Sequence, residues 1–146
     1  MNENFANFVD KFRVDDLLIY ESEYWKWSIR PLQCTIGAGI LSLKRPAETM
    51  KELNELEGAD LVRIIGVIER TINVCFGQKI MNYIMLMMVD KHVHYHVVPR
   101  YSEPVLFKGI RFSDEFWPKP PVLDTGKLDD NVLLSIRDYL CNHLEL

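Results

Sequence analysis

The histidines of this chain are concentrated in one short segment. Three of the four lie in DKHVHYHVVPRY, residues 90–101, at alternating positions: His92, His94 and His96. Residues two apart on a β-strand point to the same face, and Val and Tyr favour strands, so the segment predicts a strand with a single row of imidazoles. The intervening Val, Tyr and Val side chains then face the core. We therefore expect a sheet with one apolar face and one face that carries a functional site.

Length and composition indicate a single domain that spans residues 1–146. A chain of 146 residues with 48% hydrophobic residues can bury one good core. The segment MNENFANFVDKF lacks the basic start and apolar run of a signal peptide. The longest apolar run, IMLMMV at residues 84–89, is too short to cross a bilayer. We expect a soluble, cytoplasmic protein with no membrane partner.

Net charge indicates which partners to expect, and cysteine spacing indicates the state of the thiols. A formal net charge of −4 argues against binding to nucleic acid polymers, although a local basic pocket for a small anion stays open. Cys34, Cys75 and Cys141 are widely spaced and form no Cys-x-x-Cys pair, so we expect reduced structural thiols.

Hydrophobic periodicity predicts an α+β arrangement. Apolar residues fall at helical spacing from about Gly58 to Phe76, and Gly77 supplies a stop. A short N-terminal helix is expected at residues 4–12, and a C-terminal helix after the N-cap Asp129. The strand candidates are residues 17–22, 24–31, 37–46, 79–89 and 92–101. The last two are expected to be joined tightly at Asp90 and Lys91.

The string HVHYHVV has the pattern His-apolar-His-apolar-His-apolar-apolar that names the histidine triad family of nucleotide hydrolases and transferases. The chain resembles this family through the long helix and GILSLKRP, over about residues 17–101, with an extension at about 102–146. HVVPR is similar to the branch that hydrolyses diadenosine and other dinucleoside polyphosphates. The resemblance implies an antiparallel sheet of about five strands, one long helix and a homodimer.

The resemblance also implies a mechanism, in which the middle histidine, His94, attacks the α-phosphorus of a nucleotide. Water then releases the nucleoside monophosphate. The chemistry is sound, because an imidazole with a pKa near ~6.5 is largely neutral at pH 7 and can attack without a separate base. His92 and His96 could bind phosphate oxygens or orient the nucleophile. No cofactor is required.

Five further residues are candidates for substrate binding. The family keeps the nucleoside in a cleft formed by the early strands, which points to Arg30 and Gln33. Lys91 and Arg100 bracket the triad, where they either add positive charge or are solvated strand-end charges. Asn82 lies one strand before the triad and needs a polar partner in so apolar a strand.

The sequence departs from the family at one position. Many members carry a further histidine before or just after the strand that here contains GAGILSLKRP, where this chain has Ala38 or Pro46. That histidine usually assists near the phosphate or the leaving group. Its absence bears on substrate choice and on the rate of turnover.

Two other functions compete with catalysis. His-x-His on a strand can bind zinc, but the Cα atoms of His92 and His96 would lie about 13 Å apart at about 3.3 Å per residue, which is too far for easy convergence on one ion. No Cys, Asp or Glu cluster completes a site, so we expect no metal. The other alternative is a nucleotide-binding sensor with weak hydrolysis.

Overall fold

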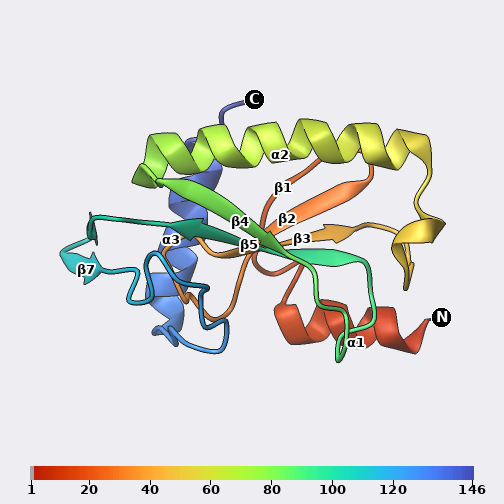
Figure 1. Ribbon diagram of the computed structural model, residues 1–146, viewed down its shortest axis with the longest axis horizontal. Coiled ribbons are helices and arrows are strands. Elements are labelled where there is room, and N and C mark those ends of the chain that lie inside the picture. Colours follow the sequence, from red (N-terminus) through yellow and green to blue (C-terminus); the bar gives the residue numbers. More distant parts are fainter. Residues whose placement is uncertain (1) are drawn as a thin grey trace.

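The computed structural model describes residues 2–146 and contains a five-stranded antiparallel sheet (Figure 1). Its strands are ordered β1-β2-β3-β5-β4. Their bounds are β1 (Leu18–Glu21), β2 (Trp25–Ile29), β3 (Gly39–Leu43), β4 (Ile80–Ile84) and β5 (His94–Arg100). The predicted α+β fold with about five antiparallel strands is confirmed.

Helices lie on both sides of this sheet. Helix α2 (Glu55–Phe76) runs along one side, and α1 (Glu3–Phe12) lies on the other (Figure 1). The α2 side holds the larger core cluster, in which Trp25 and Trp27 are fully buried. Helix α3 (Asp130–Asn142) contributes three residues to the same cluster, so the C-terminal segment is part of the main core: Leu133, Ile136 and Leu140.

The long helix α2 has well-defined ends. At its start, the Asn54 side chain accepts from the Glu57 backbone N–H, and the Glu57 carboxylate accepts from the Asn54 N–H. This reciprocal pair satisfies two backbone donors that the first turn would leave open. At its end, Gly77 adopts a left-handed conformation and donates to two helix carbonyls. The predicted helix is confirmed, and it begins three residues earlier than its apolar pattern.

The expected tight connection between the last two strands of the sheet is wrong. Residues 85–93 separate β4 from β5, and the strand begins at His94 rather than His92. The reason is that Val93 bonds to another part of the chain: its N–H donates to the Ala47 carbonyl, and its carbonyl accepts from Leu43. Residues 85–93 are therefore a loop at the end of the sheet.

The region between β5 and α3 contains a short hairpin. Strands β6 (Val105–Phe107) and β7 (Ile110–Phe112) form a separate hairpin. Lys108 and Gly109 connect them, and both have positive φ, as the favoured two-residue hairpin turn requires. None of the helices within residues 2–146 combines the length and the hydrophobicity that a membrane span needs.

Candidate active site

The triad lies on the face of the sheet opposite α2. His94 pairs with Ser42 and His96 pairs with Ile40 in the register between β5 and β3. Val93 and Val97 lie in the main core on the other face, as the alternation predicts. The three imidazoles are almost completely covered, with relative exposures of 1%, 1% and 5% for His92, His94 and His96.

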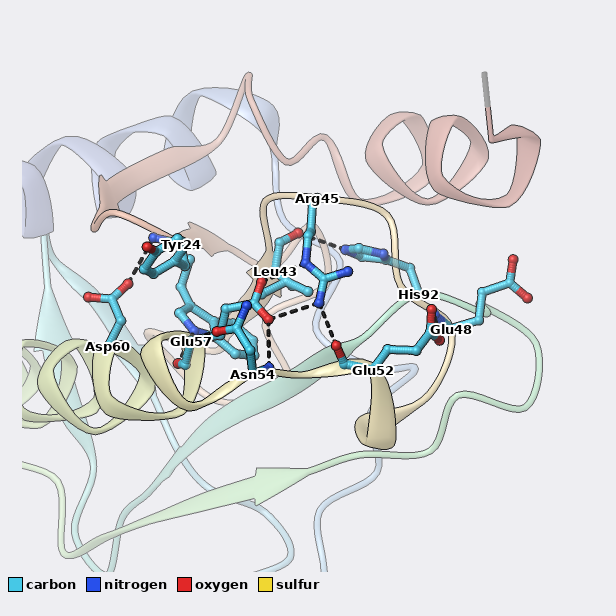
Figure 2. Close-up of polar contacts among 10 residues, drawn as sticks. Tyr24, Leu43, Arg45, Glu48, Glu52, Asn54, Glu57, Asp60 and His92 are labelled. Atoms are coloured by element: carbon cyan, nitrogen blue, oxygen red, sulfur yellow. Dashed lines mark hydrogen bonds and ion pairs between the residues drawn. The ribbon is translucent and has the colours of Figure 1, made fainter.

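His92 is held by backbone and by helix α1. Its Nε2 donates to the Leu43 carbonyl at 2.8 Å, at the end of β3 (Figure 2). Its ring packs against the rings of Phe5 and Phe8, with centroid distances of 4.7 and 4.9 Å. Within residues 2–146 its buried Nδ1 has no hydrogen-bond partner. These contacts are those of a residue that connects α1 to the sheet.

A polar network holds the end of β3, where the Leu43 carbonyl accepts the hydrogen bond from His92. Arg45 follows Leu43 closely, and its guanidinium contacts the buried Glu57 carboxylate at 2.7 Å and the Glu52 carbonyl at 2.6 Å (Figure 2). Glu57 belongs to the N-terminal cap of α2. The end of β3 is thereby tied to α2, which holds the Leu43 carbonyl in place beneath the imidazole.

His94 has one nitrogen engaged with the backbone. Its Nδ1 lies 2.5 Å from the His92 carbonyl oxygen, which can only accept, so Nδ1 carries the proton. The neutral ring then has its lone pair on Nε2. Burial is the main cause that lowers the pKa of His94 below its ordinary value of 6.5. At neutral pH this histidine is therefore uncharged, and its Nε2 is available as a base or nucleophile.

His96 has the opposite tautomer. Arg30 Nε donates to His96 Nδ1 at 3.2 Å, and a guanidinium N–H cannot accept, so the proton of the neutral ring lies on Nε2. Burial, followed by the nearby Arg30 charge, lowers the pKa of His96 to about 4. The two rings are neighbours, with centroids 5.1 Å apart. One ring offers a lone pair and the other an N–H donor.

His94 and His96 line a pocket of about 380 Å³, which His92 does not reach. The predicted row of three imidazoles thus contributes two of its members to the pocket. The pocket is built from five segments of the chain. Its other lining residues are Lys11, Phe12, Arg30, Pro31, Leu32, Leu86, Met87, Met88, Val89, Asp90, Leu123 and Asp124.

Helix α1 covers the histidine face, a feature that the sequence-based analysis missed. Phe8 packs on His94 with ring centroids 4.7 Å apart, and Phe12 packs on His96 at 5.9 Å. The two phenylalanines belong to a small second core cluster with Ile40 of β3. The signal was present in the helical spacing of the phenylalanines, which identifies one apolar face of α1.

The cations at the pocket are paired with acids. Lys11 from α1 contacts both carboxylate oxygens of Asp90 at 2.9 and 3.0 Å. Arg30 lies 3.8 Å from Asp124, and its Nη1 donates to the Leu123 carbonyl at 2.5 Å. The Lys11 side chain is half exposed, so this pair can open toward a bound anion at modest cost.

Four of the candidate binding residues lie outside the pocket lining. Arg100 is buried and pairs with Asp114 at 2.7 Å, and it donates to Asn82 at 2.9 Å, which supplies the polar partner that Asn82 needs. Gln33 is also buried, and its side chain bonds to backbone groups of its own loop. Lys91 is exposed. Of the five candidates, the structure brings Arg30 alone to the pocket.

In both histidines that line the pocket, Nδ1 is already engaged. His94 Nδ1 bonds to the His92 carbonyl, and His96 Nδ1 accepts from the Arg30 guanidinium. In the part of the chain that the structure describes, residues 2–146, no group of three or more His, Cys, Asp or Glu side chains could hold a metal ion.

Comparisons with known proteins identify the fold. No protein-family model matches the sequence, and no curated protein sequence matches it. Among solved structures, a histidine triad protein from Sinorhizobium meliloti has a TM-score of 0.72 at 16% identity, with coverage of 92% of this chain and 94% of that chain. A histidine triad protein from Bradyrhizobium japonicum gives 0.70 at 16% identity, with coverage of 99% and 97%.

The diadenosine triphosphate hydrolase of Plasmodium falciparum is similar at a TM-score of 0.65 and 12% identity, over 96% of this chain and 95% of that chain. At such identities the likeness concerns the fold. The chain therefore has the fold of histidine triad proteins.

Proposed function

We propose that this chain, whose fold is that of histidine triad proteins, is a nucleotide hydrolase or transferase that acts at an α-phosphate through a nucleotidyl-His94 intermediate. The observation that carries the proposal is the bond from His94 Nδ1 to the His92 carbonyl. It directs the lone pair to Nε2, on a ring that lines the pocket. A nucleophile with this tautomer needs no base to remove a proton before it attacks.

In the first step, His94 Nε2 forms a bond to the α-phosphorus, and the bond from phosphorus to the leaving group breaks with its electron pair. The ring becomes positively charged, and the His92 carbonyl dipole, already bonded to Nδ1–H, stabilises that charge. His96 Nε2–H donates to a non-bridging oxygen as negative charge grows there. In the second step, water attacks phosphorus and loses a proton to solvent, the bond from phosphorus to Nε2 breaks with its electron pair, and His94 leaves as a neutral imidazole.

For the substrate we propose a dinucleoside polyphosphate or a related nucleotide conjugate. The pocket volume of about 380 Å³ is within the range of small-molecule sites. Lys11, which lines the pocket and is half exposed, supplies a positive charge for a bound phosphate. One of the similar structures is itself named a diadenosine triphosphate hydrolase. The alternative is a nucleotide sensor, in which the same pocket binds nucleotide and hydrolysis is weak.

The first prediction tests the nucleophile with His94→Ala. Wild-type protein mixed with labelled diadenosine polyphosphate and quenched in base should retain label covalently, and the variant should retain none. Nucleotide affinity should stay within about tenfold, because most of the pocket lining lies on other segments. His96→Ala is the matched control and should form the intermediate more slowly. Label retained by His94→Ala would contradict the proposal, and binding without wild-type turnover would favour the sensor.

The second prediction is that the chain forms a homodimer, which we propose from the family resemblance. Strand β4 is at the edge of the sheet, and Ile80 at its start is exposed, so this edge offers backbone groups and apolar surface to a partner. Sedimentation at micromolar concentration should give twice the mass of one chain. A monomeric mass would overturn this prediction and leave the assignment of His94 intact.

A further inference from the structure

Arg30 contacts the triad at His96 Nδ1. It lies directly after β2, is buried, and directs Nε–H at His96 Nδ1 over 3.2 Å. A guanidinium remains protonated and carries only donors. His96 Nδ1 must therefore accept, and the proton of the neutral ring is confined to Nε2.

Most of the remaining polar groups of Arg30 are bonded to the protein, whereas Nη2 lies 3.8 Å from the exposed Asp124 carboxylate. Its Nη1 donates to the carbonyls of Leu32 and Leu123, at 3.2 and 2.5 Å. Its own backbone N–H donates to the Ala38 carbonyl, and its carbonyl accepts from the Gln33 side chain at 2.7 Å. A side chain held at both ends in this way is suited to orienting another residue. It is poorly suited to leaving its partners for a phosphate.

We propose that Arg30 is a positioning residue, which holds His96 in the Nε2–H tautomer so that this N–H points into the pocket at the phosphate being transferred. The inference rests on the proposed function and assigns to Arg30 a role that acts through His96. Without the Arg30 donor, the His96 proton can move to Nδ1, and the ring then presents a lone pair to the phosphate oxygen. A lone pair facing developing negative charge opposes the reaction.

The same contact has an electrostatic effect. The Arg30 charge acts with burial to lower the pKa of His96 to about 4, so that His96 remains neutral across the physiological range. A neutral ring whose tautomer is fixed is a constant donor, whatever the pH between about 5 and 8. The other titratable groups near it are His94, Asp90 and Lys11.

The third prediction tests the tautomer directly by nitrogen NMR of the full chain, with labelled histidine and no substrate. Wild-type His96 should carry its proton on Nε2 at pH 7. In Arg30→Met, which removes both donor and charge, His96 should populate both tautomers and titrate nearer to its ordinary range. Lys11→Gln is the matched control, because it removes a pocket cation that does not contact His96. The tautomer of His96 should be unchanged in this variant.

Arg30→Lys covers the case in which Arg30→Met fails to fold. It keeps the charge and loses the planar Nε donor, so the mixed tautomer should reappear. Wild-type protein with the proton on Nδ1, or an unchanged tautomer in both Arg30 variants, would overturn the inference without bearing on His94.

Kinetics separate positioning from binding. In Arg30→Met, the single-turnover rate of nucleotidyl transfer should fall by about 10²-fold, the usual effect of losing one donor to a developing oxyanion, while affinity for the nucleotide product changes less than about threefold. Weakened affinity with an unchanged rate would make Arg30 a binding residue and reject the inference. A wild-type protein without any transfer would reject the proposed function, and the tautomer measurement would still decide what Arg30 does to His96.

Discussion

At the scale of single residues, the site depends on histidines that are stable only when neutral. His92, His94 and His96 are all buried, and desolvation is the main cause that lowers the pKa of each. In the unfolded chain each returns to an ordinary pKa near ~6.5. At a pH between the folded and the unfolded pKa, the unfolded state binds more protons than the folded state. The free energy of unfolding therefore decreases as the pH falls.

The fourth prediction follows from this difference. Stability contributed by His96 is complete above pH 6.5 and is lost as the pH falls toward its folded pKa of about 4, a total on the order of 3 kcal/mol. Urea unfolding at pH 7, 6 and 5 should show this decline. His96→Asn should make the decline shallower, while His92 and His94 still contribute to it, and His143→Gln, at an exposed position, should reproduce the wild-type slope. Equal slopes for all three proteins would contradict the burial of a neutral His96.

At the scale of helices and strands, periodicity predicted the elements and their faces. The alternation of histidine and apolar residues placed Val93 and Val97 in the core correctly, because a strand has two faces. Asp129 caps α3 and Gly77 ends α2, as their backbone preferences indicate. Each of these features depends on neighbours in sequence.

Contacts between distant segments could not be predicted in the same way. Nothing local indicates that α1 packs its phenylalanines on the triad, because this depends on where the sheet exposes a complementary face. Their positions in the sequence make Arg100 and Asn82 candidates for substrate binding, whereas in the structure Arg100 donates to Asn82 and pairs with Asp114. The partner of a buried charge depends on the tertiary structure, and the spacing of residues in the sequence does not predict it.

At the scale of the whole molecule, five separate segments meet at one pocket. For the proposed reaction, the titratable groups of these segments determine which leaving group can depart. His96 has its pKa lowered to about 4, so its neutral N–H donates a hydrogen bond but is a poor acid. Lys11 is paired with Asp90, and Arg30 does not give up a proton. The resemblance places the further histidine of many histidine triad proteins at Ala38 or Pro46, and neither of these side chains can donate a proton.

The fifth prediction concerns that leaving group. A phosphate is stable as an anion near neutral pH and departs without a proton, whereas an alkyl amine needs a general acid, whose contribution is typically about 10²–10⁴-fold. Diadenosine polyphosphate should therefore turn over at least about 10²-fold faster than an adenosine phosphoramidate of an alkyl amine. An adenosine phosphoramidate of a weakly basic aryl amine is the matched control, and it should recover much of the rate because its amine needs less protonation. If the alkyl phosphoramidate turns over as fast as the polyphosphate, the pocket contains an effective general acid, and the assignment of His96 as a neutral donor is wrong.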